Sequence, residues 1–215
     1  RFWYTSGMTK RAKKVGSRSP WGKIDHVETI APGIQFCGTP SHGGYFLSDE
    51  RNAQVHPAWR SKWASSPSLD NWYEEDCRWA IVAFHFPEFF TGAQYEASVA
   101  TLKNWHPDEW EQVTGEKVKP EESHKVRERI FAAENKGKLF AIAAWGDWSR
   151  NVPKGMVGVC VTVDGERCRN HLPESPRYLL VPAELYNIPG TFVTVPGQFQ
   201  EVPADPARDG CPFGV

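Results

Sequence analysis

The sequence contains no apolar run that approaches the roughly 18 residues needed for a membrane-spanning helix. A basic, apolar and small-residue pattern of the kind that makes a secretory signal is also missing near Arg1. Because both segments are lacking, the sequence predicts a protein of the cytoplasm with no membrane partner.

Cysteine is sparse, with five residues in 215 and no CxxC pair. An odd number of widely spaced cysteines is typical of reduced thiols and not of a disulfide framework. The metal-ligand pattern HExxH and the phosphate-loop pattern GxxxxGK[ST] do not occur either. The sequence therefore predicts no cofactor and assigns no metal ligand.

Acidic residues are absent from positions 1–24, which carry seven basic residues and a charge of +7. The remaining 18 basic and 26 acidic residues give positions 25–215 a charge of −8. Residues 1–19 show no apolar period and are predicted to form a basic flexible arm. Its basic cluster can contact a phosphate backbone or an acidic protein surface, and consists of Lys10, Arg11, Lys13 and Lys14. Phe2, Trp3 and Tyr4 can stack on bases, although a solvated leader or linker has the same composition.

Residues 20–195 predict a single α+β domain, in which an N-terminal β-hairpin precedes several helices and a mainly antiparallel C-terminal sheet. The hairpin has strands at 33–37 and 45–48, joined by GTPSHGG. Capping residues, prolines and glycines predict helices at 91–104, 107–115 and 121–135. Strands are predicted at 139–145, 156–163, 177–181 and 191–195, and Asp164-Gly165 is predicted to form a two-residue hairpin turn from the second of these into a strand at 166–169. Residues 196–215 are predicted to form a proline-rich tail that is extended or disordered.

The stretch 72–90, WYEEDCRWAIVAFHFPEFF, predicts a helix at the centre of the fold. Glu74, Glu75 and Asp76 suit its first turn, where free N–H groups and the helix dipole favour carboxylates. The residues that follow are apolar on nearly every side, which predicts burial. Pro87 ends the helix.

Cys77 and His42 are the candidates for catalysis, as nucleophile and base of a thiol-dependent hydrolase or transferase. A helix start favours the thiolate, but three acidic residues precede Cys77 directly and would raise its pKa. A cysteine on an apolar helix face is also explained by packing alone. The sequence favours a structural role for Cys77 and keeps catalysis as an alternative.

A metal-dependent hydrolase or nuclease is a second alternative. His42 with the carboxylates of residues 74–76, and with His85 as a further candidate ligand, would suit a hard or borderline divalent ion. The helix dipole explains the same carboxylates without a metal. Gly43 and Gly44 follow His42 and permit positive φ or a close backbone approach, which a turn needs and a ligand can use.

Several strings together resemble an uncharacterised domain family of bacterial plasmids and phages, whose members carry a PW-G start, an STxSHGG turn and a WYEEDCxWA helix. The strings are SPWG (19–22), APGIQFCGTPSHGGYFLS (31–48), WYEEDCRWAIVAFHFPEFF (72–90), TLKNWHPDEWE (101–111), KPEESHKVRERIF (119–131) and YLLVPAELY (178–186). The resemblance spans about residues 19–195. The positions that match the family's marked segments are Ser41, His42, Gly43, Gly44, Trp72, Tyr73, Glu74, Glu75, Asp76, Cys77 and Trp79.

The resemblance implies an accessory protein of a mobile element in a bacterial cytoplasm, and it carries over no activity and no catalytic residue. We therefore expect action by binding. The partner would be a host or phage protein, such as a host-defence factor, or nucleic acid held by the basic arm. Candidate binding residues are Ser41, Gly43, Gly44, Trp72, Tyr73, Glu74, Glu75 and Asp76, together with the arm's lysines and arginine.

Overall fold

The computed structural model describes residues 12–60, 70–165, 176–208 and 210–213. Contacts divide the chain into two compact units, Arg1–Glu128 and Arg129–Val215. A four-stranded sheet and a two-stranded ribbon belong to the first unit, and a five-stranded sheet belongs to the second. The α+β class predicted from the sequence is confirmed. The single-domain boundary at 20–195 stays a prediction.

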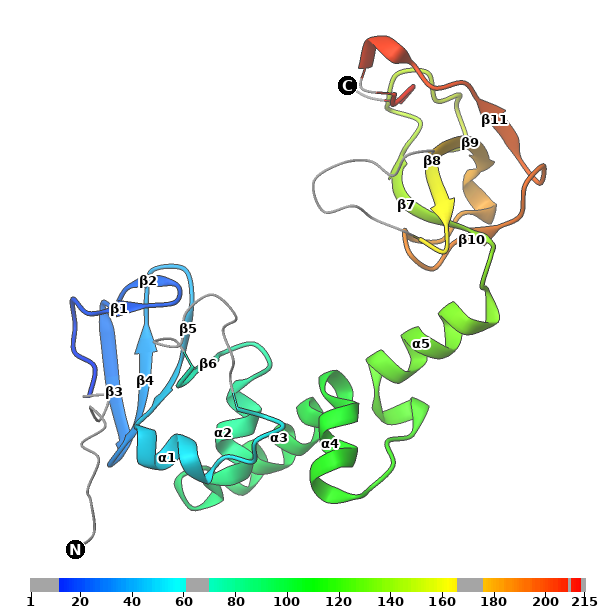
Figure 1. Ribbon diagram of the computed structural model, residues 1–215. Helices are drawn as coiled ribbons and strands as arrows, with labels where there is room; N and C mark the ends of the chain where they lie inside the picture. Colours follow the sequence, from blue (N-terminus) through cyan, green and yellow to red (C-terminus); the bar gives the residue numbers. More distant parts are fainter. Residues whose placement is uncertain (1–11, 61–69, 166–175, 209, 214–215) are drawn as a thin grey trace, which may run out of the picture. The chain divides into compact units, whose positions relative to one another are not determined.

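The sheet of the first unit is antiparallel throughout (Figure 1). Its strands, in spatial order, are β3 (His26–Ala31), β4 (Ile34–Gly38), β5 (Gly43–Leu47) and β6 (Trp72–Glu74). β4 and β5 form the predicted hairpin, paired from Ile34 and Leu47 to Gly38 and Gly43. β3 was not predicted, because this edge strand has several exposed residues and no strong apolar alternation.

The stretch predicted to open the central helix forms β6 instead. Trp72 and Tyr73 are 1% and 0% exposed, and they pack into different clusters on the two faces of the sheet. That alternation is the period of a strand. Glu75, Asp76 and Cys77 then lie in a turn, and α2 (Trp79–His85) begins after it. The placement of three carboxylates in the first helical turn is therefore wrong, whereas burial of the central helix is confirmed.

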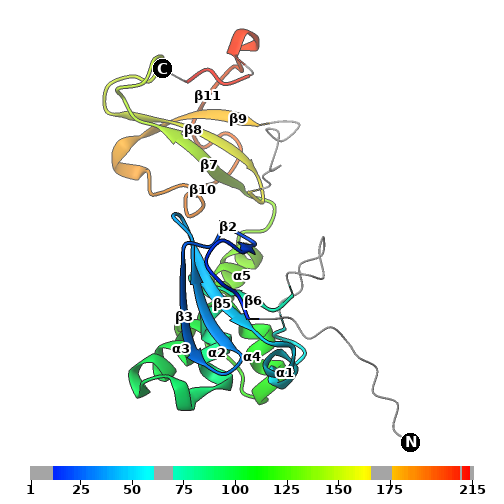
Figure 2. The ribbon, with the colours of Figure 1, turned by 90° about the vertical axis from the view of Figure 1, so that its left-hand side faces the viewer.

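α2 packs on one face of this sheet together with α3 (Gly92–Trp105) and α4 (Pro107–Thr114) (Figure 2). The chain also forms α1 (Asp49–Gln54), directly after β5, and α5 (His124–Glu134), which contains the boundary between the two units. α3 starts with the predicted capping box, in which the Gln94 N–H donates to Thr91 Oγ1 over 3.2 Å. Gly115, with φ 75°, ends α4 as predicted. The main core of this unit joins Ile34, Leu47 and Tyr73 of the sheet to residues of α2, α3 and α4.

The opposite face of the sheet is covered by the chain that precedes β3. Ile24 and Trp21 pack there against Phe46 and Trp72. Trp21 lies in the turn between β1 (Arg18–Ser19) and β2 (Gly22–Lys23), which pair as a ribbon, and Ile24 directly follows β2. Residues 12–19, predicted as part of the arm, are thus built into this unit. Lys10 and Arg11 lie outside the described residues.

The second unit is an antiparallel sheet (Figure 1). Its strands, in spatial order, are β10 (Val193–Thr194), β7 (Leu139–Trp145), β8 (Met156–Val163), β9 (Arg177–Pro182) and β11 (Gln200–Val202). β7 and β8 occupy their predicted residues. Asp164 and Gly165 follow β8 with φ 54° and 69°, the signs of the predicted type I′ turn, and the strand predicted at 166–169 lies outside the described residues.

The proline-rich tail contributes to this second sheet. β11 pairs with β9, and Phe213 is 2% exposed against Tyr178 and Gly158. A side chain at position 158 would lie 2.7 Å from the Phe213 ring, so the glycine makes room for it. The helices that the structure describes include none long and apolar enough to cross a bilayer.

Candidate functional site

Three segments that are far apart in the sequence meet beside the paired strands β5 and β6. They line a hollow of about 300 Å³, which we call the His42 hollow. Its lining residues are Trp21, His42, Gly43, Glu74, Glu75, Asp76 and Cys77. All but Trp21 were singled out from the sequence as candidates. They come together because β5 pairs with β6, with Gly44 opposite Glu74.

The two glycines let neighbouring groups approach the backbone. The Gly43 N–H donates to Glu75 Oε1 over 2.7 Å, and a Cβ at position 43 would lie 2.7 Å from Glu75 Oε2. At position 44 a Cβ would overlap the six-membered ring of Trp21 and lie 2.5 Å from the Tyr73 carbonyl oxygen. Neither glycine has positive φ. The glycines were expected to allow either positive φ or a close approach to the backbone, and the structure shows the close approach.

Glu74 shapes the turn that carries the other acidic residues. Its Oε1 accepts the N–H groups of Cys77 and Arg78 over 2.9 and 2.8 Å, and its carboxylate also accepts the Asp76 N–H. These bonds hold the chain between β6 and α2. The exposed side chains of Glu75 and Asp76 are thereby presented at the hollow.

His42 faces Glu75 across the hollow. Its Nδ1 is 3.9 Å from Glu75 Oε1, and the two side chains are 58% and 39% exposed. An exposed pair of this kind contributes about 0–1 kcal/mol. Thr39 fixes the loop, since its N–H donates to the His42 carbonyl oxygen over 2.8 Å and its Oγ1 accepts the His42 N–H. Ser41 is exposed and is not among the residues that line the hollow.

Cys77 lines the same hollow and is partly buried. Burial raises the pKa of its thiol, and the carboxylates of Glu74 and Asp76 raise it further. The thiol therefore stays protonated at neutral pH, and the surroundings oppose formation of a nucleophilic thiolate.

The family described as a domain of unknown function, DUF7007, matches residues 14–136, which is more than half of the chain. The chain belongs to this family. No curated protein and no solved structure matches it. Every residue of the His42 hollow lies inside the DUF7007 region, whereas the string at 178–186 and the whole second sheet lie beyond it.

Within the residues that the structure describes, no three His, Cys, Asp or Glu side chains are arranged to hold a metal ion. His85 has other partners: its Nε2 accepts the His56 N–H over 3.0 Å, and its Nδ1 lies 2.8 Å from the Ile81 carbonyl oxygen. This pairing requires the proton on Nδ1 and a neutral ring. Burial lowers the pKa of His85.

Three of the candidate binding residues serve packing. Trp72 and Tyr73 are buried, and the Tyr73 hydroxyl donates to Asn52 Oδ1 over 2.6 Å. The Lys13 ammonium lies 4.4 Å from the centroid of the Phe46 ring. The exposed Lys14 is on the surface of the same segment. Trp72, Tyr73 and Lys13 therefore stabilise the fold around the site and do not themselves line the His42 hollow.

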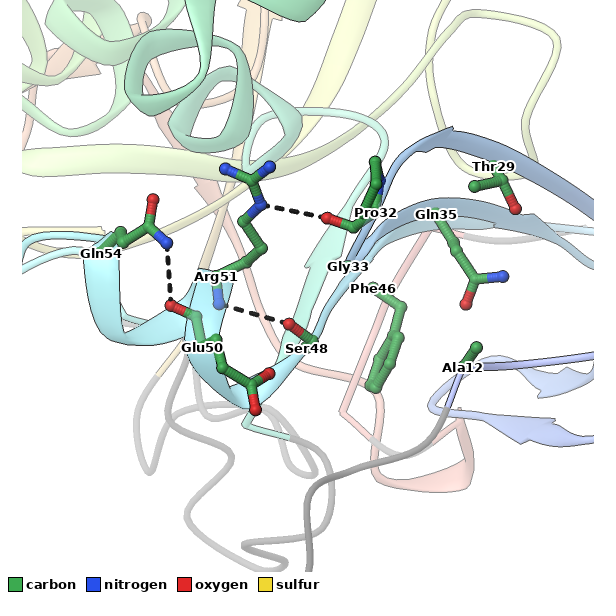
Figure 3. A pocket seen from close by; sticks show the side chains of 10 residues that line it. All are labelled: Ala12, Thr29, Pro32, Gly33, Gln35, Phe46, Ser48, Glu50, Arg51 and Gln54. Carbon is green, nitrogen blue, oxygen red and sulfur yellow. Dashed lines mark hydrogen bonds between the residues drawn. The ribbon is translucent and has the colours of Figure 1, made fainter.

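Sequence reasoning gave Trp21 no role and missed a larger hollow of about 600 Å³. Trp21 was recognisable only as part of the PW-G string, because its contact with Gly44 depends on tertiary packing. The larger hollow, which we call the Ala12 groove, lies between α1 and the first described residue, Ala12 (Figure 3). Its residues form no motif, so nothing in the sequence marked it.

Proposed function

We propose that this DUF7007 protein is an accessory protein that acts by binding, and that its His42 hollow receives a lysine or arginine side chain of a protein partner. The observation that carries the proposal is the convergence of Glu75, Asp76 and Trp21 around one small hollow. The plasmid or phage association, a host-defence factor as the partner and action in the bacterial cytoplasm belong to the same proposal.

The chemistry of the walls suits a cation. Carboxylates form strong charge-assisted hydrogen bonds with guanidinium and ammonium groups, and a tryptophan face attracts the same groups. A hollow of about 300 Å³ is at the small end of ligand pockets, which matches one side chain better than a large molecule.

Charge favours a protein partner over nucleic acid at this hollow. Residues 25–215 carry a net charge of −8, and the carboxylates of Glu75 and Asp76 would repel a phosphate backbone. Nucleic-acid binding would depend on the arm, where Lys13 is already engaged with the Phe46 ring.

Peptide binding to charge variants tests the proposal. Immobilised neutral peptides that each carry one arginine or lysine would be probed with the wild-type protein and with the double variant Glu75→Gln, Asp76→Asn. Glutamine still offers an oxygen to the Gly43 N–H, so the loop should persist. We expect the double variant to bind the best peptides at least about tenfold more weakly, since two charge-assisted bonds are weakened.

A matched control removes the same charge elsewhere. Glu88→Gln with Glu96→Gln alters two exposed carboxylates that do not line the hollow, and should leave binding nearly unchanged. Equal weakening by both pairs would show that net charge alone governs binding and would reject the hollow as the site.

A Cys77/His42 hydrolase or transferase remains the second candidate, because both side chains line the hollow. It requires a reactive thiolate, which the raised pKa of Cys77 opposes. We expect iodoacetamide to alkylate Cys77 in the native protein more slowly than in the unfolded chain at pH 7.5, as measured by peptide mass spectrometry. Faster alkylation in the native protein, lost in His42→Ala, would favour the enzyme over the binding protein.

A further inference from the structure

A second hollow, of about 530 Å³, shares a wall with the His42 hollow. It is lined by Gly16 and by residues 18–23, and we call it the Arg18 hollow. Trp21 lines both hollows. The two hollows therefore lie side by side around one tryptophan side chain, where a single partner can reach both.

The two hollows carry opposite charges. The exposed Glu75 and Asp76 line the His42 hollow, whereas the charged residues that line the Arg18 hollow are both basic, namely Arg18 and Lys23. These two residues are exposed. Within the part of the chain that the structure describes, neither of them forms an ion pair or a side-chain hydrogen bond. Their charges are therefore available to an anion from outside the molecule.

The ribbon of β1 and β2 brings the two basic residues together. Arg18 is paired with Lys23 across the ribbon, and like charges directly opposite each other destabilise a pair of strands. A bound anion would relieve this repulsion. The turn is fixed without a ligand, since Ser19 Oγ donates to the Gly22 carbonyl oxygen over 3.0 Å and accepts the Trp21 N–H over 3.2 Å. The backbone that carries the two cations is therefore already ordered before a partner binds.

We propose that the Arg18 hollow binds a carboxylate of the same partner whose lysine or arginine side chain enters the His42 hollow. Because the assignment rests on the proposed function, it narrows the partner to a segment with an acidic residue close to a basic one. Guanidinium and ammonium groups hold carboxylates by charge-assisted hydrogen bonds. In an extended peptide, residues i and i+2 point to the same side about 6.6–6.8 Å apart. One intervening residue is therefore the spacing we expect for two hollows that share one side chain.

The surrounding charge favours a carboxylate over a phosphate. Glu75 and Asp76 line the neighbouring hollow, and residues 25–215 carry a net charge of −8. A phosphate monoester carries about −1.5 to −2 at pH 7, so this field repels it more strongly than it repels a singly charged carboxylate. An acidic side chain next to a basic one places each charge against its opposite and adds no net charge to the complex.

A matched series of peptides, titrated into the full-length protein by calorimetry, tests the assignment. Each peptide has an otherwise neutral sequence with one arginine, and carries glutamate or glutamine one to four positions away on either side. At the best spacing, we expect glutamate to strengthen binding at least about fivefold over glutamine. The double variant Arg18→Gln, Lys23→Gln should lose this gain and still bind the arginine–glutamine peptide as the wild type does.

The control variant Lys136→Gln, Arg150→Gln removes two exposed basic residues that line neither hollow, and should keep the gain from glutamate. Equal affinity of the wild type for the glutamate and glutamine peptides at every spacing would overturn the assignment of the Arg18 hollow and leave the proposed function standing. Failure of every arginine peptide to bind would overturn both. Tighter binding with phosphoserine than with glutamate would assign the Arg18 hollow to phosphate and would also overturn the carboxylate.

Urea unfolding without peptide provides a second measurement. Because the facing like charges are removed, the double variant Arg18→Gln, Lys23→Gln should unfold at the same urea concentration as the wild type or a higher one. Unfolding at a clearly lower concentration would show that the two side chains stabilise the ribbon, and would contradict their assignment as a binding pair.

Discussion

Gly44 is the residue on which the shape of the His42 hollow depends most directly, because the Trp21 ring occupies the space of its missing side chain. Trp21 in turn stands edge-on to Trp72, with ring centroids 5.7 Å apart. A strand residue without a side chain thus lets one tryptophan form a wall of the hollow while another fills the core behind it.

We expect Gly44→Ala to lower the free energy of unfolding by about 1–3 kcal/mol, because the methyl group overlaps Trp21 and the Tyr73 carbonyl. Urea unfolding measures the change. The matched control is Gly92→Ala at the start of α3, where no atom lies within 4 Å of the new Cβ, and stability should hold or rise. The penalty at position 44 should shrink in a Trp21→Ala background, and an unchanged penalty would show that the two residues are not coupled.

Elements defined by local chemistry were predictable from the sequence. The capping box at Thr91, Pro107 at the first position of α4 and the turn after β8 each depend on a few adjacent residues. β6 was mistaken for the beginning of a helix because Trp72 and Tyr73 are both apolar, and only pairing with β5 shows that they face opposite ways. β11 was missed for a similar reason, since it is a three-residue edge strand defined by its pairing with β9.

The pH dependence of stability tests the neutral state of His85 at the end of α2. Its pKa is lowered by burial from an ordinary value of about 6.5, so the unfolded chain binds the proton more readily. The resulting contribution to stability is complete above about pH 6.5 and is lost as the pH falls through the lower, folded-state pKa. We expect the free energy of unfolding to fall less steeply between pH 7 and 5 in His85→Gln than in wild type, as measured by urea unfolding.

The exposed His26 supplies the control for this comparison, since His26→Gln removes an imidazole that makes no core contact. A wild-type pH profile matched by His85→Gln but altered by His26→Gln would contradict the assignment of the effect to the buried ring.

At the scale of the whole molecule, the sequence marked the parts of the candidate site without showing that they meet. The SHGG and WYEEDC strings were singled out, but their approach depends on the register of β5 with β6 and on the path of Trp21 over Gly44. These are contacts between residues more than 20 positions apart, and no local pattern encodes them. The DUF7007 match covers all of these parts, so the site belongs to the family region and not to the second sheet.

The most direct test of the account is an NMR titration of the ¹⁵N-labelled full-length protein with N-acetyl-arginine methylamide, and in parallel with its neutral citrulline analogue. The account predicts saturable shifts of the Trp21 indole N–H and of the Gly43 and Asp76 amides with arginine, and none with citrulline at the same concentration. Identical responses to the two compounds, or shifts confined to other parts of the chain, would contradict the claim that the His42 hollow binds a cationic side chain.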